Sequence, residues 1–216
     1  MYLMYSYSEL LEVQSNQIEL IKKNDNIKNV MVKGNNQTFL LSFKENDSYL
    51  LVQNCDEQYW ESMHEKNLIM RGRVPKAPGE IVVGKKFFED NPSVKIGDTI
   101  DLELGERKKD NRIVDFLSPF QDGEVFVKTD KVQYTIVGEI DRTVSSAYNG
   151  YPAYGWLNLA ETPKDAGVVV YMQAENQRKI YETVPQIAQD IGLEQDEYGD
   201  YPYRYHTALL GMYGIY

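Results

Sequence analysis

Hydrophobic and polar residues alternate in the middle of the chain and follow a helical spacing toward its ends. Ile100, Leu102 and Leu104 alternate with Asp101 and Glu103, which is the period of a strand with one face in water. Further strands are expected over 112–117, 124–128 and 132–140, and one helix over 85–90. The middle of the chain is therefore predicted to be mostly β.

The first third of the chain predicts strands and short helices. Residues 1–13 mix tyrosine, serine and apolar residues and predict a strand. Ser15 is suited to an N-cap, and Ile18 and Ile21 form the apolar stripe of a helix that ends at Asn24-Asp25-Asn26. Strands over 27–32, 38–43 and 49–53 should follow, separated by turns at Gly34-Asn35-Asn36 and Glu45-Asn46-Asp47, and then a helix over 57–67.

The last part of the chain repeats a strand followed by a helix. Residues 168–172 are an apolar run suited to a buried strand, and 175–191 predict an amphipathic helix that Pro185 should kink or split. We predict an α+β fold in which both chain ends form a discontinuous mixed α/β lobe and a mostly β lobe is inserted in the middle. The predicted bounds are 1–75 with 165–216 for the first lobe, and 76–164 for the second.

An aromatic and glycine-rich segment, YNGYPAYGW at 148–156, is predicted to be a loop. If exposed, its aromatic side chains would dock a hydrophobic or peptide partner at low entropy cost. The alternative is that the same side chains fold back as a cluster that covers the β lobe. The candidate partner-contact residues are Tyr148, Tyr151, Tyr154 and Trp156.

Charge and cysteine content narrow the function classes. The 33 acidic and 23 basic residues give a net charge of -10, which repels phosphate backbones, so no nucleic-acid partner is expected. Cys55 is the only cysteine, which excludes an intramolecular disulfide and a Cys-based zinc site. Residues 181–203 hold six acids and no lysine or arginine, and this segment is either a solvated helix end or a contact for a cation or basic peptide.

The chain carries no recognisable catalytic motif. Gly79–Lys86 fits G-x-x-x-x-G-K, but its interior is a strand-like Ile81-Val82-Val83, and Lys86 takes the place of the Ser or Thr that would hold magnesium. His64 and His206 are the two histidines, and neither belongs to a metal-binding motif. We therefore expect no catalytic residue, cofactor or metal ion. A hydrolase built on clustered carboxylates such as Asp98 with Asp101 stays an alternative, although Asp98 is also suited to close a turn.

Three short motifs occur in order between residues 72 and 98. They are the corner Gly72-Arg73-Val74-Pro75, the strand Glu80-Ile81-Val82 and the turn Ile96-Gly97-Asp98. Their order and spacing resemble the MacB-like periplasmic core domain of FtsX-family ABC transporter permeases. Weaker similarities are the helix and Asn turn of 15–30, the strand Tyr134–Gly138 and the ending 206–215, in which His206 replaces the family's asparagine.

The resemblance implies an extracytoplasmic domain at the cell membrane, without catalysis. Such a domain couples ATP-driven motion of transmembrane helices to substrate export or to a mechanical output. Its implied partners are a cytoplasmic ABC ATPase, a second permease copy in a dimer, and a peptide or accessory protein. Because no stretch approaches ~20 apolar residues and 1–7 lack the features of a signal peptide, we expect a segment that lies between two membrane spans. Its two ends must then lie side by side.

The sequence is also compatible with a second function. The chain is alternatively a free-standing extracellular binding or adhesion module that uses the aromatic segment and the acidic stretch.

Overall fold

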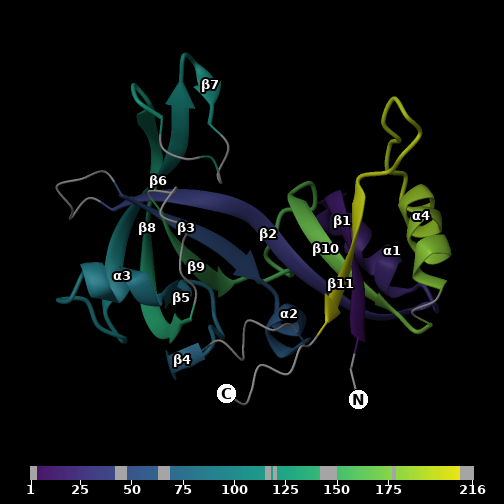
Figure 1. The fold of residues 1–216 in the computed structure, drawn as a ribbon, viewed down its shortest axis with the longest axis horizontal. Helices are drawn as coiled ribbons and strands as arrows, with labels where there is room; N and C mark the ends of the chain where they lie inside the picture. Colours follow the sequence, from purple (N-terminus) through teal and green to yellow (C-terminus); the bar gives the residue numbers. More distant parts are fainter. Residues whose placement is uncertain are drawn as a thin grey trace. The chain divides into compact units, whose positions relative to one another are not determined.

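The computed structural model describes residues 4–41, 48–62, 69–114, 118, 121–141, 150–176 and 179–209 (Figure 1). The chain forms two compact units, one made of residues 1–33 and 159–216 and the other of residues 34–158. The first combines helices with a sheet and the second is mostly strands, so the predicted α+β class is confirmed.

The first unit is a sheet on which a helix packs. Its strand order is β11, β1, β10 and the beginning of β2. The helix α4 packs against β1 and β10 and buries Val184, Ile187 and Ala188, as the spacing predicted. Pro185 lies inside α4 without splitting it. The elements are β1 (Met4–Gln14), β2 (Ile27–Leu41), β10 (Gly167–Ala174), α4 (Ile180–Asp190) and β11 (Tyr203–Leu209).

The predicted first helix is present as η1 (Ser15–Gln17) and α1 (Ile18–Lys22), with Ile18 and Ile21 buried. The start of this helix is stabilised by the side chain of Gln17 and not by that of Ser15. The Gln17 side chain accepts the Gln14 amide N–H at 2.8 Å and donates to the Ile191 carbonyl at 2.7 Å. The Ser15 hydroxyl donates to the carbonyl of Pro163 instead.

The first and last described residues of the chain are direct neighbours. Strands β1 and β11 pair antiparallel, in a register that runs from Met4 opposite Leu209 to Leu10 opposite Tyr203. Figure 1 shows the two strands side by side at the edge of the first unit. The expectation that the two ends lie together is met for the described residues.

The second unit contains most of the strands. Strand order is β3, β9, β5, β8, β6 and β7, and β4 also pairs with β8. Its core includes Leu50, Val83, Phe87, Leu102 and Ile136. The elements are β3 (Ser48–Cys55), α2 (Glu57–Ser62), β4 (Ile69–Gly72), β5 (Glu80–Gly84), α3 (Lys85–Asp90), β6 (Thr99–Lys109), β7 (Arg112–Ile113), β8 (Val125–Ile140) and β9 (Gly150–Trp156). The helix α3 has the bounds that its sequence predicted.

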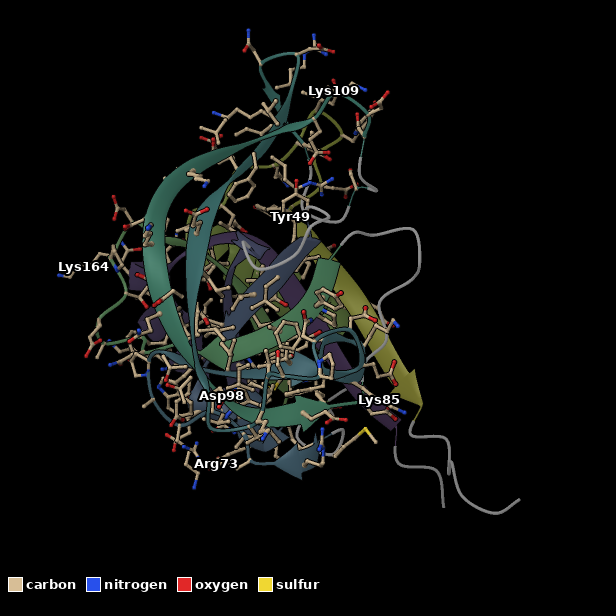
Figure 2. All side chains as sticks on the ribbon, turned by 90° about the vertical axis from the view of Figure 1, so that its left-hand side faces the viewer. Tyr49, Arg73, Lys85, Asp98, Lys109 and Lys164 are labelled. Carbon is tan, nitrogen blue, oxygen red and sulfur yellow. The ribbon has the colours of Figure 1, made fainter. Side chains whose placement is uncertain are left out.

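Long strands replace two predicted breaks. The expected turn at 34–36 lies inside β2, because β2 continues as a hydrogen-bonded strand beside β3 and β6. The expected gap between 128 and 132 lies inside β8, which stays paired with β6 through a register shift after Leu104. Lys109 marks the far end of β6 (Figure 2). There Asp110 and Asn111 take φ values of 49° and 62°, as a two-residue hairpin turn requires.

Residues 34–75 lie in the second unit, whereas the sequence-based division placed them with the chain ends. The physical reason is strand pairing at long range. Parallel pairing of β3 with β9, and antiparallel pairing of β4 with β8, tie this segment to the middle of the chain.

Candidate functional site

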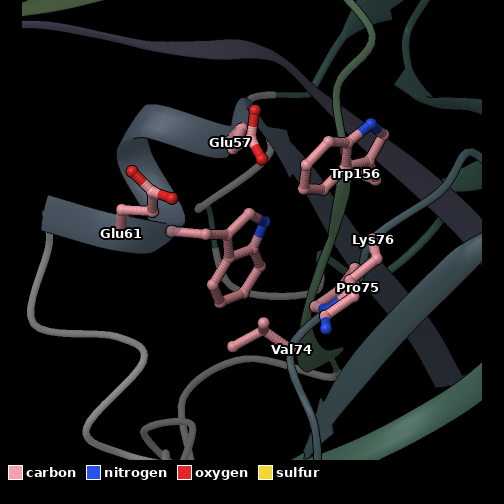
Figure 3. Close-up of a pocket in the computed structure, with 7 residues that line it drawn as sticks. Glu57, Glu61, Val74, Pro75, Lys76 and Trp156 are labelled. Carbon is pink, nitrogen blue, oxygen red and sulfur yellow. The ribbon is translucent and has the colours of Figure 1, made fainter.

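A pocket of about 490 Å³ opens in the second unit and contains both tryptophans of the chain (Figure 3). One wall is the helix α2 and the opposite wall is the segment 74–76. This volume falls in the range of ligand-binding pockets, about 300–1,000 Å³. The lining residues are Glu57, Trp60 and Glu61 from α2, Val74, Pro75 and Lys76 from the facing segment, and Trp156 from the end of β9.

Strand register brings α2 next to the end of β9. Strands β3 and β9 are parallel, with Cys55 opposite Trp156, and α2 begins directly after the following residue, Asp56. The buried Asp56 carboxylate accepts the Tyr59 amide N–H at 2.8 Å, which is the hydrogen bond of a helix N-cap. The chain therefore passes from strand β3 into helix α2 beside Trp156.

The indole of Trp60 is a fixed floor of the pocket. It is 3% exposed, and its Nε1–H donates to the carbonyl of Gly155 at 3.3 Å. The ring of Tyr154 meets it edge-on, with 6.4 Å between ring centroids, a favourable aromatic geometry. Trp156, in contrast, is half-buried and offers an accessible ring surface.

The facing wall is anchored by two glycines on adjacent strands. Gly72 lies opposite Gly138 and has a φ of +80°, a conformation that other residues rarely adopt. A Cβ on Gly72 would come within 2.3 Å of the Val137 carbonyl oxygen, and one on Gly138 within 2.6 Å of the Arg73 carbonyl oxygen. Glycine at both positions thus lets the corner lie directly against β8.

An ion pair closes the corner that carries the wall. Arg73 Nη1 lies 2.7 Å from Glu80 Oε2, and the same oxygen accepts the Lys76 amide N–H at 2.8 Å. The hydrogen bond from Arg73 lowers the pKa of Glu80 from 4.5 to about 2. Arg73 itself lies at the surface (Figure 2). These bonds position Val74 and Pro75 in the pocket.

The sequence matches no family model and no curated protein. The fold, however, is similar to that of two solved structures. The extracellular domain of the noncanonic ABC-type transporter YknZ from Gram-positive bacteria is 11% identical, with a TM-score of 0.56, over 94% of this chain and 100% of that one. The periplasmic region of MacB from Actinobacillus actinomycetemcomitans is 9% identical, with a TM-score of 0.55, over 94% of this chain and 88% of that one. The chain has a MacB-like fold.

The motifs that carried the predicted resemblance have structural roles in this MacB-like fold. Glu80-Ile81-Val82 lies in β5, and Tyr134–Gly138 lies in β8. Gly97 has a φ of +100°, and Asp98 accepts the Lys95 amide N–H at 2.8 Å, so Asp98 closes the turn before β6 as expected. The resemblance is confirmed at the level of the fold.

The aromatic segment is a strand and not the predicted loop. Tyr148 lies outside the described residues, and 150–156 form β9 between β3 and β5. Tyr151 is buried, contacts Phe87 edge-on at 5.5 Å and donates its hydroxyl hydrogen bond to Asp90 at 2.8 Å. Tyr154 is buried against Trp60. These two side chains are held in the interior by pairing on both sides of β9, and Trp156 is the predicted contact residue that lines the pocket.

Other candidate positions do not join this pocket. The segment 79–86 is the strand β5 followed by the start of α3. His64 lies outside the described residues, and His206 pairs with Tyr7 in the β1–β11 ladder. In the part of the chain that the structure describes, no group of three His, Cys, Asp or Glu side chains is arranged to hold a metal ion. Nor does that part contain a helix of the length and apolar character that a membrane crossing demands.

The sequence patterns did not predict most of the pocket lining, namely Glu57, Trp60, Glu61 and the segment 74–76. Trp60 carried the signal of a buried helix face, and Val74 and Pro75 that of a chain corner. Their meeting with Trp156 depends on the β3–β9 register, which no local pattern in the sequence specifies.

Proposed function

We propose that this chain is the extracytoplasmic domain of an ABC transporter permease. In this role it couples ATP-driven movement of transmembrane helices to export or to a mechanical output outside the membrane. The domain itself is non-catalytic, and ATP is hydrolysed by a separate cytoplasmic ATPase. A second permease copy completes the dimer.

The adjacency of Met4 and Leu209 is the observation that carries the proposal. A domain inserted between two membrane helices must receive both of them at one place. Antiparallel β1 and β11 supply such a place, because the chain enters and leaves the first unit through neighbouring strands. The MacB-like fold supports the same role, since one similar structure is the extracellular domain of an ABC-type transporter and the other is the periplasmic region of MacB.

The strand pairing also suits the transmission of force. Each end is a strand of one sheet, and β1 is hydrogen-bonded on its other side to β10. If both membrane helices move in the same direction, the two strands are displaced together and the first unit follows as a body. Movement of the helices in opposite directions would instead shear the β1–β11 ladder. The proposal therefore requires the two helices to move together.

Cysteine labelling in intact cells tests the location of the domain. Tyr198 is 81% exposed and Cys55 is fully buried, so Tyr198→Cys adds one accessible thiol to a domain whose own cysteine is shielded when folded. We expect the complete protein carrying Tyr198→Cys to react with a small membrane-impermeant maleimide in intact cells.

The unsubstituted protein is the control, and Tyr198→Cys should be labelled more strongly than this control. Labelling of Tyr198→Cys only after the cells are lysed would place the domain inside the cell and remove the proposal.

A further inference from the structure

The ends of strands β6, β7 and β8 form a small sheet with two different faces. Lys108 of β6 lies opposite Ile113 of β7 on one side and opposite Val125 of β8 on the other, and Glu106 lies opposite Val127. Directly opposite residues, and residues two apart on one strand, have their side chains on the same face of a sheet. These residues therefore share one face, which we call the outer face. Figure 1 shows β7 beside the end of β6.

The opposite face of the same strand ends is packed within the second unit. Arg107 lies opposite Phe126, and its guanidinium is 5.3 Å from the centroid of the Tyr49 ring. The same guanidinium donates hydrogen bonds to the Glu124 carboxylate and to the Ser118 carbonyl at 2.9 Å each. Ser118 and Glu124, which belong to the connection between β7 and β8, are thus bound on the Arg107 face and not on the outer face.

The outer face presents a cluster of exposed aliphatic side chains. Ile113 is 66% exposed, Val125 59% and Val127 39%. Together with Met70, they are the exposed large hydrophobic side chains in the described part of the second unit. Single exposed apolar residues are common on protein surfaces, whereas a contiguous group of them is typical of an interaction surface.

The charges of the outer face make it complementary to itself. Lys108 Nζ lies 2.8 Å from Glu106 Oε2, so the sign of the charge alternates along β6. If a second copy packs face to face on the first with β6 reversed, each Glu106 lies over the Lys108 of the other copy. The same rotation places each Val125 over the Val127 of the other copy. Such a two-fold arrangement is the commonest symmetry of protein dimers.

The size of the outer face also indicates what kind of partner it fits. A stable complex between freely diffusing proteins buries about 1,200–2,000 Å², whereas an apolar patch of a few side chains covers roughly a few hundred Å². A tethered partner is present at an effective concentration on the order of millimolar, at which a weak contact still forms. The outer face therefore fits a second permease copy in the same membrane better than a diffusing protein.

We propose that the outer face is the contact between the two permease copies outside the membrane. Val125 and Val127 of both copies form its centre, and Glu106 and Lys108 pair across it. The inference rests on the proposed transport role, because that role places the second copy in the same membrane.

Cross-linking of the complete transporter in its membrane tests this contact. Val125→Cys adds one thiol per copy at the centre of the outer face, whereas Cys55 is fully buried. We expect bismaleimidoethane, which joins two nearby thiols, to convert the Val125→Cys permease into a product of twice its mass. Leu20→Cys replaces a 54% exposed aliphatic residue of the first unit. It is the matched control, and its yield of this product should stay at the level of the unsubstituted permease.

Charge variants distinguish a specific contact from random collision. In the Val125→Cys permease, Lys108→Glu should lower the yield about fivefold, because two ion pairs across the contact become two contacts between like charges. Exchange of both charges, Glu106→Lys with Lys108→Glu, restores the alternation of sign and should restore the yield. The side chains of Lys108 and Glu106 are 32% and 43% exposed, so both variants should leave the unfolding midpoint of the domain almost unchanged.

Equal yields from Val125→Cys and Leu20→Cys would overturn the inference, and so would a product whose mass identifies a different protein as the partner. A yield that the charge exchange fails to restore would also contradict it. Failure of the proposed transport role is recognised separately, because Tyr198→Cys would then react with the maleimide only after lysis of the cells.

Discussion

Replacement of Glu80 by glutamine tests the ion pair that holds the corner beside the pocket. Glu80 accepts hydrogen bonds from the Arg73 guanidinium and from the Lys76 amide. Glutamine keeps a carbonyl acceptor of similar size but removes the negative charge. The substitution therefore isolates the electrostatic part of the interaction.

The expected cost follows from the pKa of Glu80 and from its exposure. A fall of that pKa from 4.5 to about 2 would correspond to about 3 kcal/mol without solvent screening. Because the Arg73 side chain is 47% exposed and that of Glu80 is 20% exposed, screening reduces the contribution to about 1 kcal/mol.

The contribution has a defined pH dependence. The pKa of Glu80 is lower in the folded than in the unfolded chain, so the ion pair stabilises the fold fully above pH 4.5. Its contribution is lost as the pH falls from 4.5 toward about 2. Glu80→Gln should lower the free energy of unfolding by about 1 kcal/mol at pH 7 and by less than half as much at pH 3.

Urea unfolding followed by tryptophan fluorescence measures this difference, because both tryptophans lie in the same unit as Glu80. Asp122→Asn, at an exposed carboxylate of that unit, is the matched control and should change the free energy of unfolding by less than about 0.5 kcal/mol at either pH. A cost for Glu80→Gln that is as large at pH 3 as at pH 7 would show that the charge of Glu80 is not its origin.

Three further predictions concern the second unit and the proposed movement. Glu124→Gln should lower the free energy of unfolding in urea by about 3–5 kcal/mol, because it leaves Arg107, whose side chain is 4% exposed, without its buried counter-charge. Replacing both residues, Arg107→Met with Glu124→Met, should recover most of that loss, and a double variant as unstable as the single one would contradict this account. Gly72→Ala should lower the free energy of unfolding by more than about 2 kcal/mol, because the strain of a positive φ is added to a steric clash. Gly123→Ala, with a φ of +76° and open surroundings, should lower it by about 1 kcal/mol, and equal losses would refute the clash. In the complete transporter, spin labels on Tyr198→Cys should report a distance between the two permease copies that changes when ATP is added, and an unchanged distance would argue against coupling.

Local sequence patterns correctly predicted the elements in which buried residues recur at a single period. Alternation at 100–104 predicted β6, and the helix α3 was predicted from 85–90 with the bounds that are observed. The apolar spacing of 175–191 likewise predicted the buried face of α4. In each case the side chains that face the core recur at the period of the element itself.

The prediction failed where pairing overrides local preference. Glycine and proline in 150–156 favour a loop, yet β3 and β5 flank this segment and make it a strand. Pairing also extends β2 through Gly34-Asn35-Asn36, a sequence that is typical of turns. Both strands depend on pairing partners outside the segment itself, so local composition does not predict them.

The pocket is built from two groups of residues, one that shapes its backbone wall and one that supplies its charges. Substitutions can therefore change the two properties separately. Its facing wall is shaped by the corner motif, in which Gly72 and the Arg73–Glu80 pair set the path of the backbone. Its charges come from Glu57 and Glu61, whose side chains are exposed on α2. Substitutions in the corner should therefore alter the stability of the fold and the shape of the pocket together, whereas removal of the two glutamate charges should leave the unfolding midpoint within a few degrees. A loss of stability as large as the corner variants produce would mean that the glutamates support α2 as strongly as the corner motif supports the facing wall.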